Sequence, residues 1–161
     1  MPSVLVTYYT RSGHTQAMAE SVATGVRGVE GVEVEVRPVA EVSPDDLLQY
    51  DGIILGSPVY YGTMAAEVKK LIDESVKHHG KLTGKVGGAF ASSGVAGGGC
   101  ETTILDIINA LLIHGMIVQG TASGPHYGPI SVGAPDERAC TECERLGARV
   151  GELVRRLQAG V

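Results

Sequence analysis

The stretch VLVTYYTRSGHTQAMAESV, residues 4–22, joins an apolar run to a helical pattern through a short polar interruption. Residues 4–8 form the kind of short, mostly apolar run that makes a buried strand. Met18, Ala19 and Val22 then recur at helical spacing. A strand that passes through a compact polar turn into a helix is the opening half of a β–α unit, and this unit sets the fold.

Four further apolar runs, at residues 32–36, 52–55, 86–91 and 116–118, are predicted strands. Helical periodicity fills most intervals, as at 64–72 and 104–111, and Ser43–Asp46 begins a short helix. Strands alternating with helices pair in parallel through right-handed crossovers. Runs such as DGIILGSP, residues 51–58, are apolar at consecutive positions, as in a sheet covered on both faces. The sequence therefore predicts a three-layer α/β fold with a five-stranded parallel sheet.

The composition bounds the class of protein. A chain of 161 residues with 43% hydrophobic and 19% charged residues is expected to form a single globular domain, 1–161. A net charge of -5 argues against a nucleic-acid partner. No apolar stretch reaches the roughly 20 residues that cross a bilayer. The N-terminus has no basic region of a signal peptide and the three cysteines suit a reducing compartment, so we expect a cytoplasmic protein.

The first polar loop has the content of an anion site. Hydroxyls, a glycine and the free N–H groups of a new helix combine there with positive charge from Arg11. The loop is neither Gly-x-Gly-x-x-Gly nor a Walker sequence, which disfavours a dinucleotide fingerprint and an NTPase. We expect it to bind a phosphate monoester, with an ordinary helix start as the alternative. Its residues are Thr10, Arg11, Ser12, Gly13, His14 and Thr15.

Two more loops follow predicted strand ends, where an open parallel sheet binds its ligands. Residues 56–62, GSPVYYG, bring two tyrosines that suit the wall of a flat ring, although one could pack in the core. Residues 92–99, SSGVAGGG, carry four glycines, so main-chain amides can approach a ligand edge. Plain flexibility is the alternative for this third loop. Residues 120–135 are the longest irregular stretch and hold part of the last strand near 130–132.

Four blocks of the sequence resemble, in order, those of the WrbA-type NAD(P)H:quinone oxidoreductases, which have the flavodoxin-like fold. The blocks are VLVTYYTRSGHT (4–15), DGIILGSPVYYGTMAAEVKKLID (51–73), GKVGGAFASSGVAGGGCETTI (84–104) and LLIHGMIV (111–118). PHYGPISVGAP (125–135) resembles the family's Pro-Tyr-Gly segment. The similarity covers nearly the whole chain and implies a flavodoxin-like three-layer sandwich with strand order 2-1-3-4-5.

The resemblance also implies a cofactor and an activity. FMN would place its phosphate in the first loop and its isoalloxazine between the second and third loops. NADH or NADPH would reduce the flavin by two electrons, which then pass to a quinone. The implied cofactor-binding residues are Thr10, Arg11, Ser12, Gly13, His14, Thr15, Gln16, Pro58, Val59, Tyr60, Tyr61, Gly62, Ser93, Gly94, Val95, Ala96, Gly97 and Gly98.

His114 is similar in position to a family histidine near the flavin and is the candidate catalytic residue. A helix that returns from the third loop should end at the far edge of the sheet. Contact between His114 and a flavin is therefore expected across a subunit interface or through unusual loop packing. A structural role at the helix C-terminus stays an equal alternative.

The sequence departs from the longer family members in two ways. Residues 37–52, RPVAEVSPDDLLQYDG, form a much shorter segment, and the chain has no tryptophan. Quinone specificity and tetramer contacts are thereby left open. A flavodoxin-type one-electron carrier is the main alternative function. Such carriers usually present a strongly acidic face, and this chain's net charge of -5 is modest for that role. A protein that uses flavin only for structure is a second alternative.

The remaining reactive residue types point mainly to packing. Cys140 and Cys143 share a helical face with apolar residues, so we expect them to pack rather than bind metal. Cys100 follows the third loop but has no visible catalytic partner. By the resemblance, His78 and His79 fall near the family's missing tryptophan, but exposure at a helix end is the favoured interpretation. The histidine spacing predicts no metal site. The apolar breadth of residues 104–112 predicts a homodimer or homotetramer.

Overall fold

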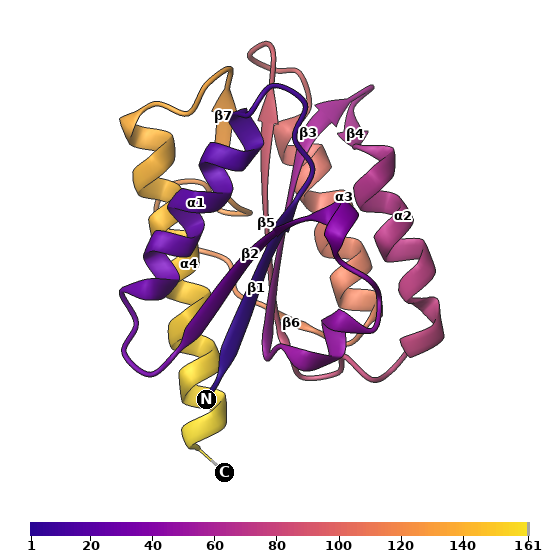
Figure 1. The fold of residues 1–161 in the computed structure, drawn as a ribbon. Coiled ribbons are helices and arrows are strands. Elements are labelled where there is room, and N and C mark those ends of the chain that lie inside the picture. Colours follow the sequence, from indigo (N-terminus) through magenta and orange to yellow (C-terminus); the bar gives the residue numbers. More distant parts are fainter. Residues whose placement is uncertain (161) are drawn as a thin grey trace.

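A computed structural model describes residues 1–160; Val161, the last residue of the predicted domain, lies outside the described residues. Helices cover both faces of a central sheet (Figure 1). Its parallel strands run in the order β2-β1-β3-β5-β6, which is the predicted order 2-1-3-4-5. The strands are β1 (Ser3–Tyr8), β2 (Glu33–Pro38), β3 (Gly52–Tyr60), β5 (Val86–Ser93) and β6 (Ile117–Val118).

Two short strands add to the five predicted ones. β4 (Thr63–Met64) pairs antiparallel with the end of β3, so the second loop is a hairpin and the sheet is not wholly parallel. β7 (Ile130–Val132) pairs with the far end of β5, as expected for residues 130–132. β6 and β7 therefore both pair with the same side of β5, one with its start and one with its end, and residues 119–129 connect them outside the sheet.

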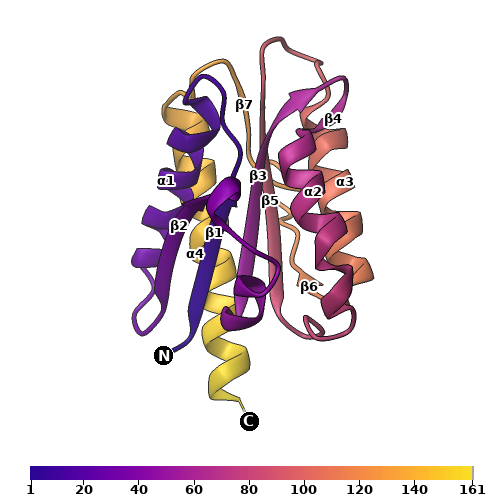
Figure 2. The ribbon, with the colours of Figure 1, turned by 45° about the vertical axis from the view of Figure 1, so that its right-hand side comes forward.

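Helices lie on both faces of the sheet (Figure 2). α1 (His14–Arg27) and α4 (Glu137–Ala159) cover one face, and α2 (Ala66–Glu74) and α3 (Cys100–Ile113) cover the other. β1 shows how the sequence supplies both layers, because Val4 and Val6 pack beneath α1 and α4 while Leu5 packs beneath α2 and α3. The core therefore lies in two slabs, as the consecutive apolar positions predict.

The connection between β2 and β3 is short, as predicted. It contains two single turns of 3₁₀-helix, η1 (Val39–Glu41) and η2 (Asp46–Gln49). The Asp46 carboxylate accepts hydrogen bonds from the backbone N–H and the hydroxyl of Ser43, at 2.7 and 2.8 Å. This local hydrogen bonding satisfies the turn without a longer helix.

Glycines set the closest contacts of the fold. A Cβ at Gly25 of α1 would lie 1.9 Å from the Glu144 carbonyl oxygen of α4, and one at Gly147 would lie 1.9 Å from that of Val22. The two helices therefore touch through their backbones. Gly56 allows a similarly close contact in the sheet, because the buried ring of Phe90 lies directly over it.

The CTEC segment packs as the sequence predicts. Cys143 is fully buried against Leu146 and Val150, and burial raises the pKa of its thiol to about 12. Cys140 is half-buried on the same helix. Within residues 1–160, no helix is both long enough and apolar enough to cross a bilayer.

Candidate functional site

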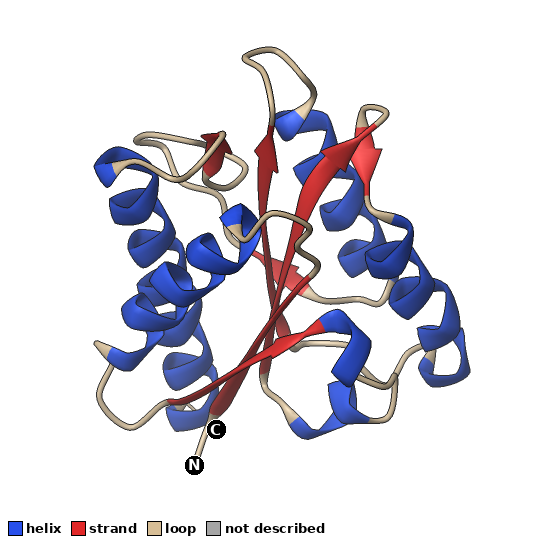
Figure 3. Ribbon diagram, turned by 45° about the horizontal axis from the view of Figure 1, so that its top comes forward, coloured by secondary structure: helices blue, strands red, loops and turns tan. Residues whose placement is uncertain are grey.

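Three loops meet at one end of the sheet, where the carboxyl ends of β1, β3 and β5 lie (Figures 1 and 3). They are residues 9–13 before α1, the β3–β4 hairpin, and residues 94–99 before α3. This is the end at which parallel α/β sheets bind ligands. The structure thus brings the three predicted segments together, because adjacent strands β1, β3 and β5 carry them.

The first loop presents the N-terminus of α1. Gly13 is its N-cap with a φ of 92°, a backbone conformation that glycine adopts without steric cost. The Gly13 N–H donates to the Thr10 hydroxyl at 3.0 Å, which closes the loop on itself. The first hydrogen bond into the helix runs from the Ala17 N–H to the Gly13 carbonyl, so the amides of His14, Thr15 and Gln16 precede it.

This loop fits a phosphate group. Among the described residues, no side chain caps α1, so its first-turn N–H groups are left for another acceptor. Space is available, because a Cβ built on Gly13 would meet no atom within 4 Å. Arg11 and Ser12 are exposed beside it and His14 is half-buried. An uncapped helix N-terminus with open space and a neighbouring guanidinium has the chemistry of a phosphate site.

The second loop is a two-residue hairpin with Tyr61 and Gly62 at its tip. Both have positive φ, 49° and 80°, as a type I′ turn requires. The side chain of Tyr61 is fully exposed, so it does not serve core packing. Tyr60 instead packs edge-on against Tyr9, with ring centroids 6.2 Å apart.

Tyr60 also links the first two loops. Its hydroxyl is buried and, within residues 1–160, has no hydrogen-bond partner. Burial raises the pKa of Tyr60, and the nearby Arg11 guanidinium opposes that rise. The Tyr9 N–H donates to the Gly56 carbonyl at 3.2 Å, which fixes the two strand ends against each other.

The third loop rises beyond the other two (Figure 2). Its exposed residues are 94–97, and the Ser93 hydroxyl donates to the Val95 carbonyl at 2.7 Å. Gly97 and Gly99 have positive φ, which lets the chain turn sharply into α3. The Thr102 hydroxyl, in the first turn of α3, lies 3.0 Å from the Gly99 carbonyl and 3.1 Å from the Gly62 carbonyl, so it links the third loop to the hairpin.

Two contacts at the site escape prediction from sequence. Ser92 closes the contact between the first and third loops, since its Oγ lies 2.9 Å from the Thr15 Oγ1. Thr102 fixes the hairpin through the bond described above. Ser92 heads the glycine-rich segment, but no local pattern pairs it with a residue 77 positions away. Cys100 is buried at the start of α3, and burial raises the pKa of its thiol, which argues against a reactive thiolate.

His114 lies away from this site on its own chain. It is the C-cap residue of α3, about 20 Å from the start of that helix at 1.5 Å per residue. The ring is buried, with Nε2 2.7 Å from the Ser75 hydroxyl. Burial lowers the pKa of His114, and His79 and His78 lower it further. This arrangement fits the alternative of a structural role for His114 at the C-terminus of α3. Contact between His114 and a flavin would need a neighbouring subunit. His78 is buried rather than exposed and bonds Asp45 Oδ1 at 2.6 Å, which corrects its prediction as an exposed residue.

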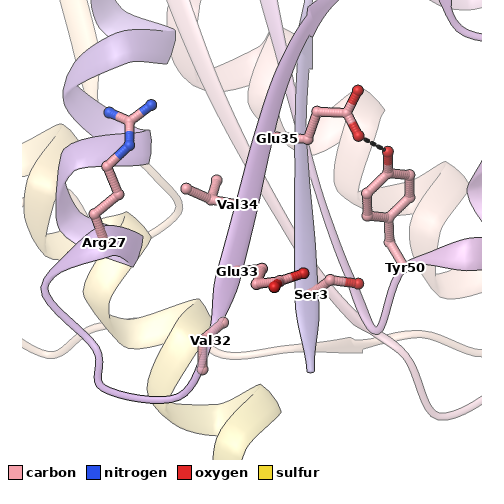
Figure 4. A pocket seen from close by; sticks show the side chains of 7 residues that line it. All are labelled: Ser3, Arg27, Val32, Glu33, Val34, Glu35 and Tyr50. Atoms are coloured by element: carbon pink, nitrogen blue, oxygen red, sulfur yellow. Dashed lines mark hydrogen bonds between the residues drawn. The ribbon is translucent and has the colours of Figure 1, made fainter. Parts of the chain in front are cut away.

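A depression of about 500 Å³ lies elsewhere, along the edge strand β2 (Figure 4). Its lining includes the start of β1 and β2, so it is at the opposite end of the sheet from the three loops. Glu35 accepts a hydrogen bond from the Tyr50 hydroxyl on one side of β2, and Arg27 lies on the other side. With Glu33 also at its rim, this depression does not suit a phosphate.

Comparison with known proteins places the fold and the loops in a family. Residues 5–108 match the flavodoxin domain family. A protein called flavodoxin from Aquifex aeolicus (strain VF5) is 38% identical over 96% of this chain and 88% of its own length. An NAD(P)H dehydrogenase (quinone) from Chromohalobacter salexigens is 33% identical over 98% of this chain and 99% of its own.

The solved structures agree. A WrbA-like flavodoxin from Agrobacterium tumefaciens superposes with a TM-score of 0.79 and 26% identity, over 97% of this chain and 99% of that one. The matched range contains all three loops. This chain therefore belongs to the flavodoxin domain family.

Proposed function

We propose that this protein is an FMN-dependent oxidoreductase that uses NADH or NADPH to reduce quinones. The relative from Chromohalobacter salexigens is named as an NAD(P)H dehydrogenase (quinone) and aligns over nearly the whole of both chains. The loops at the carboxyl ends of β1, β3 and β5 supply the groups that such a cofactor needs. FMN, when bound, supplies hydride acceptance from a nicotinamide and hydride delivery to a quinone.

The first loop would hold the phosphate. The amides of the first turn of α1 and the hydroxyls of Thr10, Ser12 and Thr15 are its donors, with Arg11 adding positive charge. The remaining binding residues follow from the positions of the other loops. The hairpin residues Pro58, Val59, Tyr60, Tyr61 and Gly62 flank the ring, and Ser93, Gly94, Val95, Ala96, Gly97 and Gly98 approach its polar edge.

The observation that carries the enzymatic reading is the openness of the third loop. Residues 94–97 are exposed, and no aromatic side chain lies in residues 92–99. A flat cofactor held by the tyrosine-bearing hairpin would therefore keep one side free for a second flat molecule. The main-chain N–H groups of this loop can stabilise negative charge that develops at the reduced ring edge. The protein's task is then to bind, orient and leave access, and no side-chain nucleophile is needed.

A one-electron carrier is the second candidate, favoured by the 38% identity to the Aquifex aeolicus flavodoxin. A carrier docks a protein partner and needs no room for a nicotinamide beside its flavin. Carriers that steer basic partners present a strong negative field, whereas this chain has 18 acidic and 13 basic residues. The modest charge and the open third loop both favour the enzyme.

Initial-rate kinetics of the FMN-loaded protein test the proposal. With benzoquinone and either NADH or NADPH varied, we expect parallel double-reciprocal lines, because the two substrates occupy the same open side in turn. Comparison of the rates with NADH and with NADPH also measures which nicotinamide the protein prefers. Turnover no faster than that of free FMN at the same concentration would contradict the enzymatic function.

Assembly and location are also proposals. Leu112 and Ile113 at the end of α3 and Val76 beside α2 are exposed, at 54, 72 and 70%. Burial of these side chains against a second copy would remove apolar surface from water, which favours a homodimer or homotetramer. Light scattering after size exclusion measures this. A cytoplasmic location fits the three free cysteines.

A further inference from the structure

A buried hydroxyl pair joins the phosphate loop to the central strand. Thr15 lies in the first turn of α1 and Ser92 lies near the end of β5. Their hydroxyl oxygens are 2.9 Å apart, and the two residues are only 2 and 6% exposed. The pair is a contact between residues 77 positions apart, at the point where the first and third loops meet.

Counting protons shows that this pair is incomplete. Each hydroxyl has one proton to donate, and the mutual hydrogen bond uses only one of the two. Within residues 1–160, neither hydroxyl has a second hydrogen-bond partner. One buried O–H therefore has no acceptor among residues 1–160, and a buried donor without an acceptor is destabilising. Such a donor calls for an acceptor oxygen from outside the described chain, and a bound phosphate can supply one.

The surroundings decide which hydroxyl keeps the free proton. If Thr15 donated to Ser92, the spare O–H would belong to Ser92, near the end of a strand paired on both sides. If Ser92 donates, the spare O–H belongs to Thr15, among the uncapped first-turn amides of α1. The second arrangement adds the proton to a group of donors that converge on an anion.

We propose that Ser92 is a positioning residue for the cofactor phosphate. Its hydroxyl donates to the Thr15 Oγ1, and this holds the Thr15 O–H toward a phosphate oxygen. The donation also polarises the Thr15 hydroxyl, so that it donates more strongly. This inference rests on the proposed binding of FMN. The strand makes Ser92 a rigid support, because β5 pairs at Ser92 with Pro58 of β3 and with Ser131 of β7.

The test compares two ligands that differ only in the phosphate. Dissociation constants of FMN and riboflavin are measured by fluorescence quenching for the wild type, Ser92→Ala, Thr15→Val and the double variant. Ser131→Ala is the matched control, since it removes a buried hydroxyl on the neighbouring strand that donates to the Gly133 carbonyl at 2.7 Å. Circular dichroism and urea midpoints establish that each variant is folded.

The expected result is a loss of affinity confined to FMN. Ser92→Ala weakens FMN about fivefold to tenfold and riboflavin by less than about twofold, as for loss of support to a charge-assisted hydrogen bond. Thr15→Val weakens FMN more, and adding Ser92→Ala to it has no further effect, because Ser92 acts through Thr15. Ser131→Ala leaves the ratio of the two dissociation constants unchanged.

Two outcomes overturn the inference. Equal weakening of both ligands by Ser92→Ala would show a merely structural hydroxyl, and additive losses in the double variant would show that Ser92 does not act through Thr15. Either result leaves the proposed function standing. A wild-type protein that binds FMN no better than riboflavin would instead contradict the phosphate site, and the proposed function with it.

Discussion

At the scale of single residues, Tyr61 combines a strained backbone with an exposed ring. Its φ of 49° is uncommon for a residue with a Cβ, and its side chain makes no use of the core. Strain of this kind persists where the residue serves a purpose other than stability. This fits a tyrosine held at the hairpin tip to flank the cofactor.

We predict that Tyr61→Asn stabilises the protein without FMN by about 0.5–1 kcal/mol. Asparagine adopts positive φ more readily, and Asn-Gly is the preferred pair for a type I′ turn. Urea unfolding measures the change, with Tyr127→Asn as the control, since Tyr127 is also exposed but does not have positive φ. A Tyr61→Asn protein less stable than wild type would show that the tyrosine ring contributes packing that its exposure hides.

His114 gives the protein a pH dependence of stability. Burial, with His79 and His78 nearby, lowers the pKa of His114 below its ordinary 6.5. The unfolded chain therefore binds a proton at His114 more readily than the folded chain does. The stability from a neutral His114 is fully present above about pH 6.5 and is lost as the pH falls toward its lower folded-state pKa.

We predict that His114→Gln removes much of the fall in unfolding free energy between about pH 7 and pH 5. Glutamine can still hydrogen-bond the Ser75 hydroxyl but does not titrate. Denaturant titrations at the two pH values measure the difference. His126→Gln is the control, because His126 lies in an exposed loop and its ring hydrogen-bonds the Thr121 carbonyl rather than a buried side chain. An unchanged pH dependence in His114→Gln would assign the effect to other groups.

At the scale of elements, the contact between α1 and α4 depends on glycines at two positions. An alanine is normally favoured over glycine inside a helix by about 1 kcal/mol. At Gly147 the new Cβ would meet the Val22 backbone at 1.9 Å, and backbone cannot move aside as a flexible side chain does. Steric overlap therefore outweighs helix propensity here.

We predict that Gly147→Ala lowers the free energy of unfolding by about 2–3 kcal/mol, as overpacking in a dense core does. Gly28→Ala is the control, since Gly28 has a φ of -71° and its Cβ would come no closer than 3.4 Å to another atom. It should change stability by less than about 1 kcal/mol in either direction. A neutral Gly147→Ala would mean that α1 and α4 can slide apart at little cost.

The same scale shows what sequence patterns reveal about elements. Continuous apolar runs identify the central strands because their residues face two helical layers, as Val4, Leu5 and Val6 do, whereas the edge strand β2 alternates Glu and Val. The β3–β4 hairpin was missed because Tyr61 occupies the place where Asn or Asp would announce the turn. The glycine contacts were missed because a glycine inside a helical pattern does not reveal what lies opposite it.

At the scale of the whole molecule, strand order explains why the meeting of the three loops could be predicted. Parallel strands β1, β3 and β5 are neighbours, so any loop that follows them reaches the same end of the sheet. Contacts between loops were not predictable, because Thr15 with Ser92 and Thr102 with Gly62 join residues far apart in sequence. The direction of the helix after the third loop predicts that His114 lies away from the three loops of its own chain. The structure agrees, because His114 ends α3.

The most direct test of the account is a visible absorption titration of the FMN-loaded protein without oxygen. On addition of one equivalent of NADH or NADPH, we predict that the flavin band disappears in a single two-electron phase and that benzoquinone restores it. The three loops would then hold a flavin that is open to both substrates. A protein that leaves added FMN unbound, or whose bound flavin neither nicotinamide reduces, would contradict the account.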